Sequence, residues 1–201
     1  YLDWWPVCLG FNNLEPPFDD PEVRRAVNHA IDREQLVKIG WQGAGTSSHL
    51  PLPNFPPIRN YTDGIQDLID KYEIGVYDPA KTAEILQRKG WSKDGEGFWS
   101  KGGERLTMVV DIFGIFNDLA PVLVAQLKQA GIDASFRLTS DTFTRMAQGT
   151  ARAYMMGNGA VPCAIRTLRC AFNIAALCSR LAHTQSASGA GPTPSTMRLL
   201  I

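Results

Sequence analysis

Short apolar runs along the chain have the length and spacing of buried strands. Residues 6–12 form such a run, which two asparagines end. Residues 106–112 form another, and residues 132–138 alternate between apolar and polar side chains. The sequence Lys-Gly-Gly-Glu at 101–104 has the composition of a hairpin turn, between the short segment 97–99 and the strand that follows. The pattern therefore places strands at the start of the chain and in its second half.

Helix starts are marked by an aspartate that is followed by proline. Asp20 has the chemistry of an N-cap, Pro21 fits the first helical position, and the apolar residues after them recur at helical spacing. Asp78 and Pro79 repeat this pattern, and Gly90 has the character of a helix end. The expected helices lie over residues 20–31, 32–40, 78–90, 118–130 and 140–146, the last capped by Ser140. This alternation of helices and strands predicts an α/β fold, with a mixed sheet flanked by helices.

Composition narrows the range of functions. The chain has 201 residues, of which 44% are hydrophobic, and its 20 Lys and Arg balance 20 Asp and Glu. Without a basic excess there is no reason to expect nucleic acid or an anionic membrane surface as a partner. No apolar run reaches the roughly 18 residues of a transmembrane helix. The sequence therefore describes an ordinary globular chain.

Motifs for catalysis and metal binding are absent from the sequence. The four cysteines form no C-x-x-C pair and no histidine stands at zinc spacing, so we expect no metal site and no cofactor. No G-x-S-x-G, P-loop, H-E-x-x-H or Rossmann glycine motif occurs. The three histidines are scattered, and His29 is expected to cap its helix or to lie on the surface. These observations favour a binding protein over an enzyme.

Two long segments carry a more specific resemblance. Residues 12–43 contain P-P-F-D-D-P-E-V-R-R-A-V-N-H-A-I-D-R-E-Q-L-V after a strand that ends in F-N. Residues 77–91 read Y-D-P-A-K-T-A-E-I-L-Q-R-K-G-W, and a hairpin and a helix ending in Q-L-K-Q-A-G-I-D follow. Both segments resemble family 5 of the extracytoplasmic solute-binding proteins, the peptide, dipeptide and nickel type of receptor for ABC importers.

The resemblance implies a fold and a function. Residues 1–158 would be a fragment of the second lobe of a periplasmic-binding-protein-like fold (type II, cluster C). The whole receptor would be a monomer that captures peptides or similar small solutes in the periplasm, or an equivalent extracytoplasmic space, and delivers them to ABC permease subunits. The alternatives are the solute-sensing domain of a transcription regulator and a fragment of an α/β enzyme. The sequence does not identify the solute.

The resemblance also implies candidate site residues. Trp41, which lies between glycines, is the candidate cleft aromatic, and four residues near the end of the last expected strand follow by their position in the family. The candidate solute-binding residues are Trp41, Met155, Met156, Gly157 and Asn158. Asn12 and Asn13 are candidate hinge residues at the lobe-crossing strand. Surface packing of Trp41 and a simple turn at the two asparagines are the alternatives.

Residues 159–201 differ in character from the rest of the chain. This segment has no clean periodicity, holds three of the four cysteines and ends in a stretch rich in Ser, Gly, Pro and Thr. A one-base regrouping of the codons for Ala160 to Thr167 permits Gly-Gly-Ser-Val-Arg-Asp-Pro-Tyr, which resembles the family. The restored aspartate, which often meets a peptide's terminal amine in the family, would replace Ile165. We therefore expect residues 159–201 to be an out-of-frame, disordered tail, and an ordinary disordered terminus is the alternative.

Overall fold

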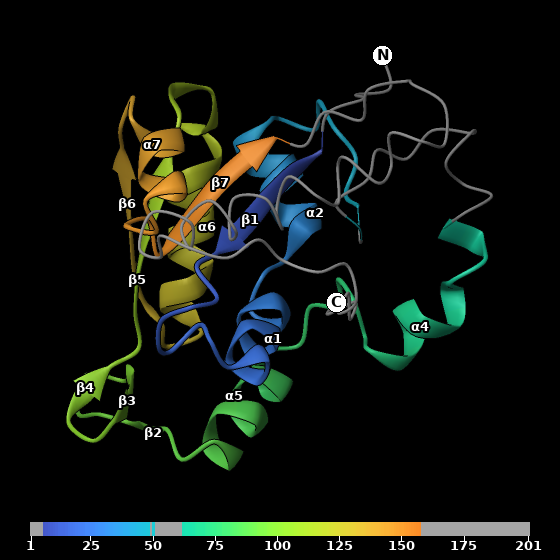
Figure 1. The fold of residues 1–201 in the computed structure, drawn as a ribbon. Coiled ribbons are helices and arrows are strands. Elements are labelled where there is room, and N and C mark those ends of the chain that lie inside the picture. The colour runs from blue at the N-terminus through green and yellow to red at the C-terminus, as the bar shows by residue number, and fades with distance from the viewer. Residues whose placement is uncertain (1–5, 49, 51–61, 158–201) are drawn as a thin grey trace, which may run out of the picture.

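The computed structural model describes residues 6–48, 50 and 62–157, and everything below concerns those residues. A four-stranded sheet forms the centre of the fold (Figure 1). In spatial order its strands are β1 (Val7–Phe11), β7 (Ala153–Gly157), β5 (Thr107–Ile112) and β6 (Asp133–Leu138). Strand β5 runs parallel to β6 and β7, whereas β1 is antiparallel to β7. The predicted mixed sheet is therefore confirmed, and the expected tail lies outside the described residues.

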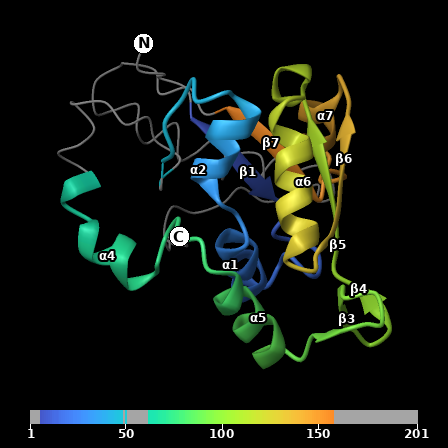
Figure 2. The same cartoon turned by 180° about the vertical axis from the view of Figure 1, so that it is seen from behind.

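Helices pack against this sheet and against one another. They are α1 (Pro21–His29), α2 (Arg33–Gln35), the π-helical turn η1 (Leu36–Gly40), α4 (Gln66–Lys71), α5 (Pro79–Arg88), the 3-10 turn η2 (Gly114–Phe116), α6 (Leu119–Gln129) and α7 (Thr142–Ala147). Figure 2 shows α6 and the α2–η1 segment side by side over one face of the sheet. Helix α5 packs on α1, where the Thr82 hydroxyl donates to the carbonyl of Ala26 at 3.0 Å.

The predicted helix starts are confirmed. Asp20 accepts a hydrogen bond from the backbone of its own first turn, Asp78 does the same, and a proline follows each of them. Helix α7 begins at Thr142 after Asp141, so the expectation of a Ser140 cap is wrong. The carboxylate of Asp141 bonds the hydroxyl of Thr139 instead of a helical N–H group. Helix α4 was not expected, and no side chain caps its start.

The predicted glycine turn joins two short strands of a separate three-stranded sheet. This sheet contains β2 (Ser92–Lys93), β3 (Trp99–Lys101) and β4 (Glu104–Arg105). Gly102 and Gly103 have φ values of 62° and 86°, the conformation that a two-residue hairpin turn requires and glycine adopts without strain. The strand expected over 106–112 does not continue this hairpin, because β5 turns away into the main sheet.

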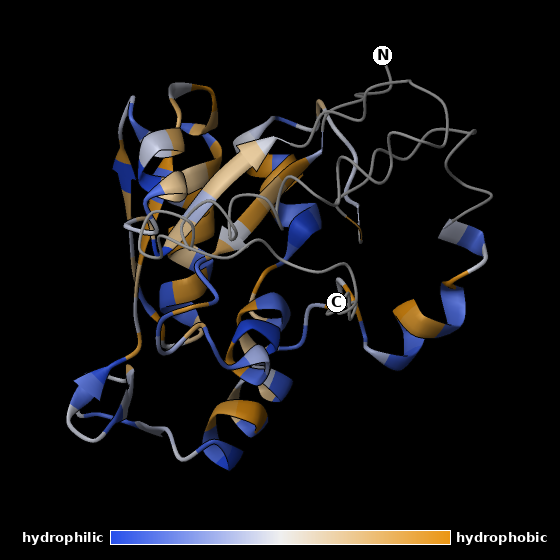
Figure 3. Cartoon of the chain, in the orientation of Figure 1, coloured by the Kyte–Doolittle hydropathy of each residue, from blue (hydrophilic) through white to orange (hydrophobic). Residues whose placement is uncertain are grey.

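The hydrophobic core lies between the sheet and the helices. Met108, Val110 and Ile112 alternate along β5 toward this core and are completely buried. Leu123 and Leu127 of α6 are buried against the same core. Figure 3 shows the apolar residues gathered in the sheet and in α6. Burial of one such side chain contributes about 1.5–3 kcal/mol to stability. Within the described part of the chain, no helix has the length and apolar character needed to cross a bilayer.

Candidate functional site

The carboxyl ends of the parallel strands meet at one edge of the main sheet. Strand β5 leads into η2, the chain then turns back into α6, and β6 ends beside them (Figure 1). We call residues 40–44, 113–118 and 138–143 the carboxyl edge. In open α/β sheets ligands bind beyond the carboxyl ends of the strands, because connecting loops diverge there. This edge is therefore the candidate binding surface.

An open pocket of about 540 Å³ lies at the carboxyl edge. The described residues that line it are Gly40, Trp41, Gln42, Ala44 and Asp118. A Cβ atom on Gly40 would lie 2.6 Å from Cδ2 of Leu119 and 3.2 Å from the carbonyl oxygen of Asp118. A larger residue at this position would have to displace the Leu119 side chain, so the end of η1 rests directly on the start of α6. The sequence candidate Trp41 is thereby placed in the wall of this pocket, and it also packs against the core.

Three exposed apolar side chains also lie on the carboxyl edge. Ile115 is 62% exposed, Leu138 57% and Phe143 64%. The ring of Phe143 packs against that of Phe113, with centroids 4.7 Å apart. Single exposed apolar residues are ordinary on protein surfaces, but a group gathered at one strand edge indicates a contact surface. The sequence pattern did not single out Ile115, Leu138 and Phe143, because these three residues lie in or beside loops.

A buried carboxylate holds the strands of this edge in place. Asp111 of β5 is completely buried, and its Oδ1 accepts bonds from Nε and Nη2 of Arg137 at 2.7 and 2.6 Å. Its Oδ2 accepts from Nε of Arg145 at 2.7 Å. This hydrogen bond raises the pKa of Arg145. The three side chains connect β5, β6 and α7, and we interpret them as positioning residues.

The other candidate solute-binding residues lie in and directly after β7. The side chain of Met155 is 5% exposed and belongs to the core, so we expect it to act through packing. Met156 and Gly157 are partly exposed and pair with β1. Asn158 lies outside the described residues. Solute binding by these residues stays a prediction.

Asn12 fixes the end of β1 to the turn before β7. Its Nδ2 donates to the carbonyl of Gly149 at 2.9 Å, and its Oδ1 accepts from the backbone N–H of Leu14 at 3.0 Å. Asn13 follows and is exposed. The strand pairing of Val7 with Gly157 lies at the other end of β1, away from Asn12. The hinge role of the two asparagines stays a prediction.

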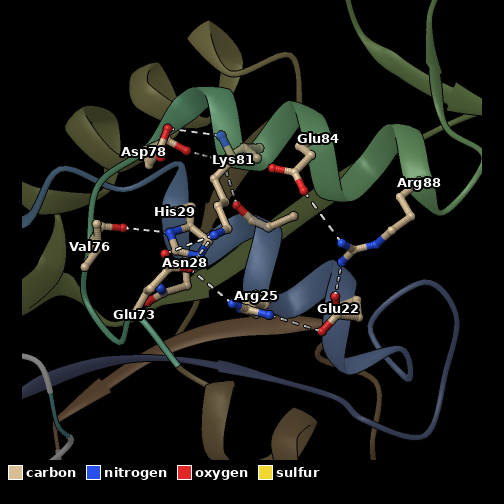
Figure 4. A network of polar contacts seen from close by, with 12 residues as sticks. Glu22, Arg25, Asn28, His29, Glu73, Val76, Asp78, Lys81, Glu84 and Arg88 are labelled. Atoms are coloured by element: carbon tan, nitrogen blue, oxygen red, sulfur yellow. Dashed lines mark hydrogen bonds and ion pairs between the residues drawn. The ribbon is translucent and has the colours of Figure 1, made fainter. Parts of the chain in front are cut away.

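A second polar cluster joins α1, α5 and the segment after α4 (Figure 4). His29 is completely buried, and its Nδ1 lies 2.9 Å from the carbonyl oxygen of Val76, which fixes Nδ1 as the donor. Its Nε2 has no hydrogen-bond partner among the described residues and lies 3.9 Å from Oε2 of Glu73. The expected surface or capping role of His29 is therefore wrong. Its partners lie more than forty residues later in the sequence, where no local pattern connects them.

Glu73 is the centre of the charges in this cluster. Its carboxylate bonds Nζ of Lys81 at 2.7 Å and Nη2 of Arg25 at 3.2 Å. The hydrogen bond from Lys81 lowers the pKa of Glu73 below its ordinary value of 4.5, with the positive charges of Lys81 and Arg25 acting in the same direction. The cluster lies on the α1–α5 side of the molecule, and its contacts tie the chain after α4 to α1 and α5.

Among the residues that the structure describes, no group of three His, Cys, Asp or Glu side chains could hold a metal ion. Comparison with known families then assigns the fold. Residues 3–164 match the family described as bacterial extracellular solute-binding proteins, family 5 middle. The chain belongs to this family. Its mixed sheet with flanking helices is the periplasmic-binding-protein-like architecture.

Relatives of this family 5 chain are named as binding proteins. The heme-binding protein A of Haemophilus influenzae is 39% identical over 92 residues, which are 45% of this chain and 15% of the relative. The oligopeptide-binding protein AppA of Bacillus subtilis is 29% identical over 136 residues, or 66% of this chain and 24% of the relative. The chain thus spans less than a quarter of the length of these relatives.

A solved structure has the same fold. NikA of Brucella suis, in complex with Fe(III)-EDTA, superposes with a TM-score of 0.71 at 21% sequence identity. The superposition covers 90% of this family 5 chain and 36% of NikA. This similarity establishes the architecture of the chain.

Proposed function

We propose that this chain is part of the substrate-binding component of an ABC importer. The component captures peptides or similar small solutes outside the cytoplasmic membrane and delivers them to permease subunits. The match of residues 3–164 to the family 5 solute-binding proteins carries the proposal. The names of the relatives, which include a heme-binding and an oligopeptide-binding protein, favour solute binding over catalysis.

Within this receptor, residues 1–158 provide part of the second lobe, and the receptor acts as a monomer. The family match runs to residue 164 and therefore includes the first six residues of the segment 159–201, which we propose to be an out-of-frame tail. The first lobe comes from the rest of the receptor. The two lobes close around the solute by a hinge motion, and the closed form docks on the permease.

The carboxyl edge is the part of this lobe that faces the solute. Its pocket has polar and apolar walls in similar measure, and its exposed apolar group adds the apolar surface that small-molecule sites use beside a few polar groups. Trp41 contributes an aromatic wall, and Met156, Gly157 and Asn158 lie at or beyond the end of β7. Binding makes and breaks no covalent bond, so these residues need shape and charge complementarity alone.

The proposal is tested by thermal unfolding of the chain with and without mixed di- and tripeptides. A peptide present at one hundred times its Kd stabilises the folded state by about 2.7 kcal/mol. For a domain of this size we expect Tm to rise by roughly 5–10 °C. Ile115→Ser should reduce this rise because it removes an exposed apolar contact from the carboxyl edge.

The matched control is Leu14→Ser, which changes an apolar residue of similar exposure (55%) in the turn after β1. It should leave the peptide-induced rise unchanged. An unchanged Tm with every peptide pool would reject solute binding by this chain. Equal effects of the two substitutions would reject the carboxyl edge as its location.

A further inference from the structure

Asp118 differs from the other aspartates that precede helices. Asp20, Asp32 and Asp78 each accept a hydrogen bond from a backbone N–H of the helix that they begin. Asp141 bonds a neighbouring threonine hydroxyl. Asp118 makes no capping bond at the start of α6, and no described residue forms a hydrogen bond or ion pair with its carboxylate. Its negative charge is therefore available to another molecule.

The backbone explains why this carboxylate does not cap its helix. Residues that cap a helix through their side chain are usually extended, and Asp20 has φ −77° and ψ 116°. Asp118 follows the 3-10 turn η2 and has φ −83° and ψ −27°, which is already helical. The side chain instead lines the open pocket beside η1. The chain thus places an exposed, unpaired carboxylate in a concave surface.

Trp41 lines the same pocket and gives it a second preference for positive charge. The face of an indole ring attracts ammonium and guanidinium groups, and a carboxylate forms charge-assisted hydrogen bonds with both. The close contact of Gly40 with Leu119 holds the Trp41 loop against the start of α6. Among the described residues that line the pocket there is no lysine or arginine.

We propose that Trp41 and Asp118 form a subsite for a positively charged group of the solute, either a primary ammonium or a guanidinium. The proposal rests on the solute-binding function proposed above and adds the charge of the solute to it. The exposed side chain of Ile115 lies three residues before Asp118 and provides an adjacent apolar surface. A solute with a cationic group next to an apolar side chain fits this arrangement.

The positive end of α6 opposes this preference but does not cancel it. A helix N-terminus carries about half an elementary charge, spread over its free N–H groups, whereas the carboxylate carries a full negative charge. Over the described residues that line the pocket the charge is therefore negative, which favours a cation over an anion.

The test compares two probes, phenylalanyl-alanine amide and its N-acetyl derivative, by isothermal titration calorimetry with the full chain. The acetyl group replaces the terminal ammonium by a neutral amide. The free amine should bind about tenfold more tightly, as expected for one charge-assisted hydrogen bond at an open site. Asp118→Asn should abolish this preference and leave the affinity for the acetylated probe unchanged. Trp41→Leu should weaken binding of the free amine more than binding of the acetylated probe.

Asp67→Asn is the matched control, because Asp67 is also an exposed aspartate at the start of a helix but lines no described pocket. It should keep the tenfold preference. Circular dichroism shows whether each variant keeps the fold. A preference that survives Asp118→Asn would overturn the subsite and leave the solute-binding function intact. Failure of both probes to bind the unchanged chain would overturn the proposed function, and the subsite with it.

Discussion

Replacement of Asp111 by asparagine tests the arrangement of the carboxyl edge. Asp111 is completely buried and accepts hydrogen bonds from Arg137 and Arg145 through different oxygens. An asparagine of the same shape keeps one oxygen acceptor but presents an NH₂ group to the other arginine. The substitution therefore removes one charge-assisted bond, places two donors against each other and leaves two guanidinium groups without their shared counter-charge.

The size of the effect follows from burial. Removal of one partner from a fully buried ion pair costs about 3–5 kcal/mol. The arginine side chains are 46% and 24% exposed, so water compensates part of this loss. We expect Asp111→Asn to lower the free energy of unfolding by about 2–4 kcal/mol. For a domain of this size this corresponds to a decrease in Tm of roughly 5–15 °C.

Urea unfolding followed by circular dichroism measures this change. The matched control is Asp133→Asn on the neighbouring strand β6, because no described residue forms a hydrogen bond or ion pair with the side-chain carboxylate of Asp133. It should change the free energy of unfolding by less than about 0.5 kcal/mol. An Asp111→Asn variant as stable as the Asp133→Asn variant would refute the claim that this carboxylate holds the strands together.

Two further predictions concern the rest of the fold. Gly131→Ala should lower the free energy of unfolding in urea by more than about 2 kcal/mol. The reason is that Gly131 has φ 88° and that an added Cβ would lie 2.8 Å from the carbonyl oxygen of Gly97. A variant as stable as the unchanged chain would show that the turn relaxes freely. The folded-state pKa of Glu73 is lowered below 4.5, so its stabilising contribution is complete above that pH and is lost as the pH falls through the folded value. Glu73→Gln should therefore flatten the decrease in Tm between about pH 5 and pH 3, and parallel curves for both proteins would contradict this assignment.

The sequence predicted those parts of the fold that depend on neighbouring residues. The caps at Asp20 and Asp78 are local, because an extended aspartate needs only the N–H groups of the next turn. The glycine turn at 102–103 is equally local. Asp118 shows the limit of such inference: its residue type predicts a cap, but the preceding turn η2 sets its backbone and leaves the side chain free.

The remaining features depend on contacts between distant parts of the chain. Nothing near Asp111 in the sequence indicates that arginines 26 and 34 residues later would surround it. His29 lies on a helix whose pattern does not show that its imidazole is completely buried. Trp41 could be proposed as a cleft aromatic by resemblance. That Asp118 lines the same pocket could be seen only from the packing of η1 on α6.

The most direct test of solute binding at the carboxyl edge is a nitrogen–proton correlation NMR titration of the ¹⁵N-labelled chain with phenylalanyl-alanine amide. The account predicts that the largest shift changes fall within residues 40–44, 113–118 and 138–143. Signals of the small β2–β4 sheet, over residues 92–105, should stay in place. Largest changes in that small sheet, or no changes anywhere, would contradict the account.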